Sequence, residues 1–390
     1  MTPFRLAVMT ATRAEYGHMR GIIRRAHEDP AVRLQLVVAG MHLDPAFGRT
    51  ASEIEADGIP VSARVPLPLS GDSELSVARA IGAGTPRFAA AFARLRPHAL
   101  LVLGDRYELL AAVPAAAALG IPVAHLHGGE ATEGVMDELV RHAVTKMSHL
   151  HFTAAEPYRR RVIQMGEHPS RVLNVGAPGL EALRLLKKMT RAELEADLGF
   201  SLVGKFALVT YHPETPRAAA AETPAIFRAL RSAGIRAVAT NPNADAGGRA
   251  VNAFLRAETR RRPGAVLAVP SLGQRRYLSL MALCGAVVGN SSSGLLEAPV
   301  LRAPTVNVGG RQAGRLRAPS VIDCRPETGS VLRALRLAFS AAFVRTRCRG
   351  VSPYGGGAVS ARVLQALKAL PREPRPLRKS FYELPWRKRA

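Results

Sequence analysis

A short stretch near residue 290 has the composition of a phosphate-binding turn. Gly289 and Gly294 enclose an asparagine and three serines, between the apolar run 286–288 and the helix-like run 295–301. A strand that ends at glycine before a helix begins leaves several backbone N–H groups without partners, at the positive end of the helix dipole. The turn therefore predicts a phosphate site, with Glu297 in the first helical turn, within reach of a ribose hydroxyl pair. The alternative is an ordinary serine N-cap.

Other polar residues follow predicted strands in the same way. Apolar strands alternate with helices over residues 6–152, and the alternation begins again over residues 206–308. This pattern predicts an α/β protein with two Rossmann-like domains, whose parallel sheets face a central cleft. Ligands bind such sheets at the carboxyl ends of the strands. The polar residues at the predicted ends are Arg13, Asp105, His127, Glu130, His212, Ser291, Ser292 and Ser293.

The chain divides into three predicted segments. They are a first Rossmann-like domain at residues 1–175, a second at 176–365, and a basic, proline-rich tail at 366–390. Within the first domain, residues 10–18 are predicted to form a loop before a helix at 19–27. Residues 176–205 are predicted to be a connection that contains one charged helix at 191–198.

The composition limits the classes of partner. The 390 residues carry a net charge of +24, which suits nucleic acid, an anionic membrane surface or anionic small ligands. The basic residues are mostly scattered arginines without interleaved aromatic residues, so we expect an anionic small ligand and no nucleic-acid partner. No apolar run reaches the ~18 residues of a membrane span. The three cysteines form no C-x-x-C pair, so we expect a cytoplasmic protein without disulfides.

An ordered set of short motifs extends from residue 5 to about residue 370. The motifs are T-R-A-E-Y-G at 12–17, G-D-R at 104–106, H-L-H-G-G-E at 125–130, D-E-x-x-R-H-A-V-T-K at 137–146, N-S-S-S-G-x-x-E at 290–297, G-G-R-Q at 309–312 and P-Y-G at 353–355. On these motifs the chain resembles the UDP-N-acetylglucosamine 2-epimerase family, and especially its hydrolysing, sialic-acid-type branch. The resemblance implies the two-domain fold shared with GT-B glycosyltransferases, which agrees with the alternation of strands and helices.

The resemblance also implies a reaction at C2 of UDP-N-acetylglucosamine. A base would remove the C2 proton while UDP leaves C1, forming an acetamidoglycal. Addition of water would then give N-acetylmannosamine and UDP, whereas addition of UDP would give UDP-N-acetylmannosamine. The chemistry needs acid/base groups tuned by burial and donors around the diphosphate, but no metal or redox cofactor. The product would serve sialic-acid-like or antibiotic sugar biosynthesis, and the resemblance implies a homodimer.

The same resemblance implies roles for individual residues. Asp105, Glu130 and Asp137 are the acid/base candidates; the alternatives are a helix cap for Asp105 and a stabilising first-turn carboxylate for Asp137. Arg141 lies one helical turn after Asp137, where it would face the sugar or form a surface ion pair. The implied catalytic residues are Asp105, His127, Glu130, Asp137, Arg141 and His212. The implied substrate- and nucleotide-binding residues are Arg13, His18, Ser291, Ser292, Ser293, Gly294, Glu297 and Arg311, and Arg13, His212 and Arg311 would contact the diphosphate.

One position departs from the family pattern. Many members carry an acid/base glutamate where this chain has His127. The nearest carboxylate here is that of Glu130, so either His127 or Glu130 could transfer the proton. The alternative is that His127 has a structural role. The spacing to Asp137 is also one residue longer. These changes leave open a 4-amino-modified sugar of the diacetylbacillosamine type. A GT-B glycosyltransferase and a non-catalytic sugar-nucleotide sensor are further alternatives.

His125 and His127 share one face of a strand, but no third metal ligand follows at a convincing spacing.

Overall fold

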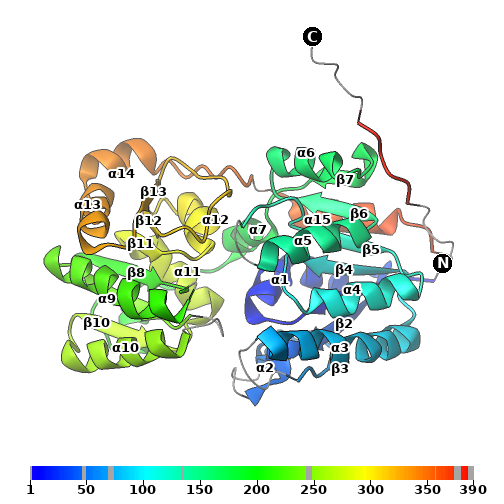
Figure 1. Ribbon diagram of the computed structural model, residues 1–390, viewed down its shortest axis with the longest axis horizontal. Helices are drawn as coiled ribbons and strands as arrows, with labels where there is room; N and C mark the ends of the chain where they lie inside the picture. The colour runs from blue at the N-terminus through cyan, green and yellow to red at the C-terminus, as the bar shows by residue number, and fades with distance from the viewer. Residues whose placement is uncertain are drawn as a thin grey trace, which may run out of the picture. The chain divides into compact units, whose positions relative to one another are not determined.

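The computed structural model describes residues 2–45, 50–68, 74–132, 136–213, 215–242, 248–355, 357–372 and 379–384. The chain forms two compact units. Unit 1 comprises Met1–Ala182 with Tyr354–Ala390, and unit 2 comprises Leu183–Pro353. Each unit contains one parallel β-sheet flanked by helices (Figure 1), so the predicted α/β class with two Rossmann-like sheets is confirmed.

The sheet of unit 1 has seven parallel strands, and their order reverses near the middle of the sheet. Its strands are β1 (Phe4–Thr10), β2 (Val32–Ala39), β3 (Val61–Val65), β4 (Ala99–Leu103), β5 (Val123–Leu126), β6 (Leu150–Thr153) and β7 (Val172–Asn174). They pair in parallel in the order β3-β2-β1-β4-β5-β6-β7. The order reverses between β1 and β4, and such a switch point is where open α/β sheets bind ligands.

Helices cover both faces of this sheet. They are α1 (Arg13–Glu28), η1 (Gly40–Leu43), α2 (Ala51–Ala56), α3 (Glu74–Leu95), α4 (Leu109–Ala118), α5 (Met136–Met147), α6 (Glu156–Gln164), η3 (Pro169–Arg171), α7 (Pro178–Leu185) and α15 (Val359–Lys368). Leu6 and Val8 of β1 pack into one core with α1 and α15, whereas Ala7 and Met9 pack into the other with α3, α4 and α5. Successive side chains of a strand point to opposite faces, so β1 contributes to both cores.

The last helix belongs to unit 1, although it follows unit 2 in the sequence. Val359, Val363 and Leu367 of α15 are buried in the same core as α1. The Ser360 N–H also donates to Glu181 Oε2 of α7 at 2.7 Å. The units therefore divide after residues 182 and 353, whereas the sequence places the second domain at 176–365. The difference arises because the apolar face of α15 has its partner in unit 1.

Helix α1 begins at Arg13, inside the segment that is predicted to be a loop. Thr12 Oγ1 accepts from the Glu15 N–H at 3.3 Å, and Glu15 Oε2 accepts from the Thr12 N–H at 3.0 Å. This reciprocal capping box satisfies two of the backbone N–H groups at the helix start. The predicted loop at 10–18 is therefore wrong from residue 13 onward, because the T-x-x-E pair starts the helix before its apolar periodicity becomes visible.

Unit 2 repeats the architecture with a smaller sheet. Its strands are β8 (Phe206–Thr210), β9 (Arg236–Thr240), β10 (Val266–Val269), β11 (Ala286–Gly289), β12 (Thr305–Val308) and β13 (Val321–Cys324). They pair in parallel in the order β10-β9-β8-β11-β12-β13. Its helices are α8 (Arg191–Leu198), α9 (Pro216–Ser232), α10 (Gly248–Arg261), α11 (Gly273–Leu283), α12 (Ser293–Val300), α13 (Thr328–Ala338) and α14 (Ala341–Arg347). Over the described ranges, no helix is long and apolar enough to cross a membrane.

The strands that the sequence pattern does not reveal lie at the edges of the two sheets. They are β3 and β7 in unit 1 and β13 in unit 2. Each is short and only partly buried, so it lacks the continuous apolar run that marks a central parallel strand. The predicted connection at 176–205 likewise contains α7 in addition to the expected charged helix α8.

Strand β11 ends at a glycine that other residues cannot replace without strain. Gly289 has a φ of +131°, and a Cβ added there would lie 1.9 Å from the carbonyl oxygen of Thr210 on β8. Only glycine allows both this backbone conformation and this close approach. The residue therefore positions the serine loop, which we define as residues 290–293.

We expect Gly289→Ala to destabilise unit 2 by about 3 kcal/mol or more, because the backbone must move to relieve the added Cβ. Thermal unfolding followed by circular dichroism, with hydrogen exchange over residues 183–353, measures the loss. Gly264→Ala is the matched control, because its φ is ordinary and no atom lies within 4 Å of the added Cβ. Equal stability of the two variants would contradict this account of Gly289.

Candidate functional site

The predicted polar residues of unit 1 lie at the carboxyl edge of its sheet. Arg13 follows β1, Asp105 follows β4, and His127 and Glu130 follow β5. Arg141 reaches the same edge from α5, since it contacts Asp105. Parallel strands present their carboxyl ends at one edge, which is why residues far apart in the sequence meet here.

The guanidinium of Arg141 holds this edge together. It is fully buried, and it donates to Asp105 Oδ2 (Nε, 3.0 Å, with a second contact from Nη2) and to Glu138 Oε2 (Nη1, 2.6 Å). It also donates to the Glu130 carbonyl oxygen at 3.0 Å and to Thr132 Oγ1 at 2.7 Å. Burial opposes the charge, but the carboxylates of Asp105, Glu130 and Glu138 together outweigh burial and raise the pKa of Arg141. The guanidinium therefore stays charged and fixes the positions of the groups around it.

His127 and Glu130, the two alternatives for proton transfer, form one hydrogen-bonded pair. His127 Nδ1 and Glu130 Oε1 are 2.5 Å apart, and both residues are buried. His127 has a φ of +65°, a strained conformation that surrounding contacts must hold in place. The other ring nitrogen, Nε2, has no hydrogen-bond partner within the described ranges, so it remains for a ligand atom. The two residues thus form one hydrogen-bonded pair, and they are not independent candidates for proton transfer.

Two predicted binding residues of unit 1 lie on α1. The ring of His18 is 6.3 Å from the ring of His127, centroid to centroid. Arg13 is the first residue of α1, and its Nη1 lies 3.9 Å from Glu53 Oε1 with both side chains largely exposed. His18 is therefore beside the proton-transfer pair, whereas Arg13 is open to solvent.

The carboxylate of α5 that contacts Arg141 belongs to Glu138, a residue that the sequence prediction leaves without a role. Glu138 Oε2 also accepts from the Thr132 N–H at 2.6 Å, and Oε1 lies 3.0 Å from His142 Nε2. Burial raises the pKa of Glu138, but the Thr132 N–H and Arg141 have the larger combined effect in the opposite direction. The pKa is therefore below its ordinary value, and the carboxylate is ionised at neutral pH. Asp137 lies one residue earlier, in the first turn of α5, and its acid/base role stays a prediction.

A second buried group of charges, absent from the prediction, lies beside the ends of β1 and β4. Glu15 Oε2 accepts from the N–H groups of Ala11 and Thr12 at 2.7 and 3.0 Å, while Oε1 has no hydrogen-bond partner in the described part of the chain. Arg106 donates to the fully buried Glu108 at 3.0 and 3.2 Å. Burial, and then the Glu108 carboxylate, raises the pKa of Glu15 to about 7. This carboxyl therefore gains and loses a proton near neutral pH.

His125 has a structural role. Its Nε2 lies 2.7 Å from the carbonyl oxygen of Gly104, and its Nδ1 lies 3.2 Å from Thr145 Oγ1. Burial lowers the pKa of His125 to about 3, so the ring is neutral at pH 7. Both ring nitrogens are engaged, and the histidine joins the end of β4, next to Asp105, to α5.

In unit 2, Asn290 ties together the loops that follow β8 and β11. Its Oδ1 accepts from the His212 N–H and its Nδ2 donates to the His212 carbonyl oxygen, each at 2.7 Å. Gln312 Nε2, from the loop after β12, donates to the Asn290 carbonyl oxygen at 2.7 Å. The predicted residues His212 and Arg311 are thereby brought to the edge that carries the serine loop.

The serine loop presents hydroxyl groups and free backbone donors. Ser291 Oγ and Ser293 Oγ are 3.0 Å apart, and Tyr277 Oη lies 2.7 Å from Ser293 Oγ and 3.3 Å from Thr210 Oγ1. The Ser292 side chain makes no cap hydrogen bond, so the alternative of an ordinary serine N-cap does not apply to it. Within the described residues, the N–H groups of these three serines donate no hydrogen bond. The arrangement suits an anion at the start of α12.

The remaining predicted residues of unit 2 lie on α12 and after β12. A Cβ added to Gly294 would lie 2.7 Å from Thr305 Cγ2, so this glycine lets α12 pack closely on β12. Glu297 is buried one turn later, and burial raises its pKa to about 8, so its carboxyl is mostly protonated at pH 7. Arg311 is half-buried in the loop after β12.

Known proteins resemble this chain over nearly its whole length. The sequence model of the UDP-N-acetylglucosamine 2-epimerase family matches residues 24–368. A UDP-N,N'-diacetylbacillosamine 2-epimerase (hydrolyzing) of Legionella pneumophila is 36% identical, covering 94% of this chain and 96% of that protein. A GDP/UDP-N,N'-diacetylbacillosamine 2-epimerase (hydrolyzing) of Campylobacter jejuni is 34% identical, covering 83% of this chain and 85% of that protein.

Solved structures share the fold. A putative UDP-N-acetylglucosamine 2-epimerase from Listeria monocytogenes has a TM-score of 0.80 at 18% identity, covering 95% of this chain and 96% of that one. The UDP-GlcNAc 2-epimerase from Neisseria meningitidis, bound to UDP-GlcNAc, has a TM-score of 0.79 at 17% identity, covering 93% of this chain and 99% of that one. These likenesses confirm the GT-B-like fold class.

The raised pKa of Glu15 predicts a specific pH dependence of stability. Below pH ~4.5 the carboxyl is protonated in both the folded and unfolded states. As the pH rises toward ~7, the unfolded state ionises first, so the wild-type protein loses up to about 3 kcal/mol that Glu15→Gln does not lose. Urea unfolding of both proteins between pH 4 and pH 8 measures the difference.

Glu28→Gln is the control for this experiment, because Glu28 is an exposed carboxylate at the end of the same helix, α1. Its pH dependence should match that of the wild-type protein. Parallel curves for Glu15→Gln and the wild type would show that Glu15 has an ordinary pKa in the folded state.

Proposed function

Because the chain belongs to the UDP-N-acetylglucosamine 2-epimerase family, we propose that it inverts C2 of a UDP-linked 2-acetamido sugar and releases the sugar by hydrolysis. UDP-N-acetylglucosamine is the first proposed substrate, giving N-acetylmannosamine and UDP. One observation carries the proposal: the buried guanidinium of Arg141 contacts both the Asp105 carboxylate and the Glu130 backbone. Two acid/base candidates are thereby held in one network.

The proposed reaction has two steps. In the first, a base takes the C2 proton, the C–H electron pair forms the C1–C2 double bond, and UDP leaves with the electron pair of its C1–O bond. In the second, water adds its oxygen to C1 and a proton returns to C2 from the other face. Each proton transfer needs a group whose charge state suits it near neutral pH.

In unit 1, the proposed roles follow from the contacts that hold each group in place. Asp105 is proposed as one acid/base group, because Arg141 fixes its carboxylate on one side. The His127–Glu130 pair is proposed as the other, because a histidine hydrogen-bonded to a carboxylate can receive a proton and later return it. His127 Nε2 is the atom proposed to face the sugar. Asp137 keeps its predicted acid/base role as a proposal.

In unit 2, the serine loop is proposed to hold the diphosphate of the same substrate. Its three N–H groups and the start of α12 stabilise the negative charge of the leaving UDP. Arg311 and His212 are proposed to contact the diphosphate, and Arg13 keeps its predicted binding role as a proposal. Glu297 is proposed to bind the ribose hydroxyls, since its protonated carboxyl can both donate and accept a hydrogen bond.

A second candidate substrate is a UDP-linked diacetylbacillosamine. The hydrolysing relatives from Legionella and Campylobacter are named for that sugar and are 36% and 34% identical to this chain. His127 stands where many family members carry a glutamate, which also separates this chain from the common pattern. The reaction steps are the same for both sugars, because the diacetylbacillosamine type is modified at C4 whereas the proposed reaction takes place at C1 and C2.

We propose in addition that the enzyme works as a homodimer in the cytoplasm. The homodimer rests on the family resemblance, and the cytoplasmic location rests on the three cysteines, which form no C-x-x-C pair. Size-exclusion chromatography with light scattering tests the first, and a monomer at micromolar concentration would remove it.

Incubation with each substrate in deuterated water, followed by proton NMR, tests the proposed function. We expect the released sugar to have the manno-type configuration at C2, with deuterium at that carbon and free UDP. An epimerised sugar that stays linked to UDP would show that the enzyme catalyses the non-hydrolysing reaction and would contradict the proposed hydrolysis. Turnover of only the diacetylbacillosamine substrate would select the second candidate, and no exchange with either sugar would overturn the proposal.

Asp105→Asn tests the assignment of the acid/base group. We expect deuterium exchange at C2 to fall by about 100-fold or more while UDP binding, measured by calorimetry, stays the same. Asp197→Asn is the control, because Asp197 forms a surface ion pair with Arg276 in unit 2. Unchanged exchange in a folded Asp105→Asn protein would remove Asp105 from the mechanism.

A further inference from the structure

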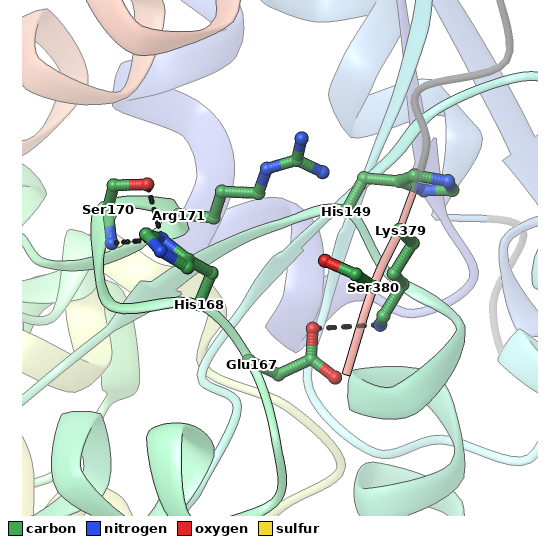
Figure 2. Close-up of a pocket in the computed structure, with 7 residues that line it drawn as sticks. All are labelled: His149, Glu167, His168, Ser170, Arg171, Lys379 and Ser380. Atoms are coloured by element: carbon green, nitrogen blue, oxygen red, sulfur yellow. Dashed lines mark hydrogen bonds and ion pairs between the residues drawn. The ribbon is translucent and has the colours of Figure 1, made fainter. Parts of the chain in front are cut away.

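A cavity at the opposite edge of the unit 1 sheet is lined mainly by hydrogen-bond donors. It has a volume of about 240 Å³ and lies where two strands begin, since His149 precedes β6 and Arg171 precedes β7. The candidate catalytic residues follow the carboxyl ends of β4 and β5, so this cavity is a separate site. The lining donors are His149, His168, Ser170, Arg171, Lys379 and Ser380 (Figure 2).

The cavity has an excess of positive charge. Among its lining residues the carboxylate is that of Glu167, which already binds Lys146 Nζ at 2.7 Å, Lys379 Nζ at 2.8 Å and His151 Nε2 at 3.0 Å. Burial opposes ionisation, but these partners lower the pKa of Glu167 to about 2. The Arg171 side chain makes no hydrogen bond or ion pair within the described ranges. Around the cavity, Lys146, Lys379 and Arg171 thus carry three positive charges, whereas Glu167 carries one negative charge.

The two histidines add ring N–H donors to the cavity. His149 Nδ1 accepts from the Val123 N–H at 3.3 Å, and His168 Nδ1 accepts from the Ser170 N–H at 3.3 Å and from the Ser170 hydroxyl at 2.8 Å. Because Nδ1 accepts in each ring, the ring proton lies on Nε2, which can donate. Burial, followed by the charge of Lys379, lowers the pKa of His149 to about 4, so this ring is neutral at pH 7.

The C-terminal segment, residues 379–384, supplies two of the donors. Lys379 Nζ donates to the Ser148 carbonyl oxygen at 2.6 Å, at the end of α5. The Phe381 ring covers Gly166, where an added Cβ would lie 2.3 Å from the ring, and the Tyr382 N–H donates to the Gly166 carbonyl oxygen at 2.9 Å. The cavity is complete only while this segment is docked, so any ligand in it stabilises the docked state.

We propose that this cavity binds a phosphoryl group, held by Arg171 and the hydroxyl group of Ser380, and that the ligand keeps the C-terminal segment docked. A phosphoryl oxygen only accepts hydrogen bonds, which matches a cavity of donors, and a guanidinium can bind two such oxygens at once. A liquid water takes up about 30 Å³, so there is room for this group and several waters. Inorganic phosphate and a phosphomonoester both supply this chemistry.

Hydrogen exchange of the full-length protein in low-salt buffer tests the proposal. It does not measure turnover, so its result is independent of the proposed epimerase activity. Inorganic phosphate and glucose 6-phosphate are titrated separately. We expect slower exchange over residues 379–384 with one or both. Protection by phosphate alone identifies a site for the free ion, and protection by glucose 6-phosphate identifies a site for a phosphomonoester.

Arg171→Gln should raise the half-maximal phosphate concentration by about 10- to 100-fold, because a charge-assisted hydrogen bond is lost. Arg160→Gln is the matched control, since it removes the same charge from an exposed position on α6 and should not change the titration. Ser380→Ala, a change confined to the C-terminal segment, should weaken binding by about threefold to tenfold. No protection by either ligand, or equal titrations for Arg171→Gln and Arg160→Gln, would overturn the proposal.

Discussion

Arg141 has no contact with solvent, so its charge and its N–H donors must be satisfied from within unit 1. The carboxylates of Asp105 and Glu138 and the oxygens of Glu130 and Thr132 meet this requirement. They come from the ends of β4 and β5 and from α5, so the three elements must stay in register. The contacts that stabilise this edge are therefore the contacts that position the acid/base candidates. Stability and positioning cannot be separated at this edge of the sheet.

Unit 2 organises its edge by different means. Neutral amide groups of Asn290 and Gln312 join the loops, and Gly289 allows β11 to approach β8 closely. These contacts leave the N–H groups at the start of α12 unused. A fixed carboxylate there would repel a phosphate, whereas neutral clamps preserve the positive potential of the helix end. Unit 1 thus contains the acid/base candidates, and unit 2 contains the candidate phosphate-binding loop.

The sequence predicts the central strands well because parallel strands buried on both faces are continuous apolar runs. The same logic places Asp105, His127 and Ser291 at carboxyl edges. The edge strands β3, β7 and β13 are only partly buried, and their pattern is too weak to detect. The environment of a side chain is also invisible in the sequence: Glu15 lies in a segment predicted to be a loop, and only its burial beside Glu108 reveals the raised pKa. Likewise, helical spacing puts both Asp137 and Glu138 within reach of Arg141, and only the structure shows that Glu138 makes the contact.

Helix α15 completes the core of unit 1 from the far end of the chain. A ribosome therefore finishes all of unit 2 before it makes the helix that covers α1. Until then, the nascent first unit exposes the apolar surface that Val359, Val363 and Leu367 later bury, and it is open to chaperones or to aggregation. The core of unit 1 is thus complete only after all of unit 2 has been translated.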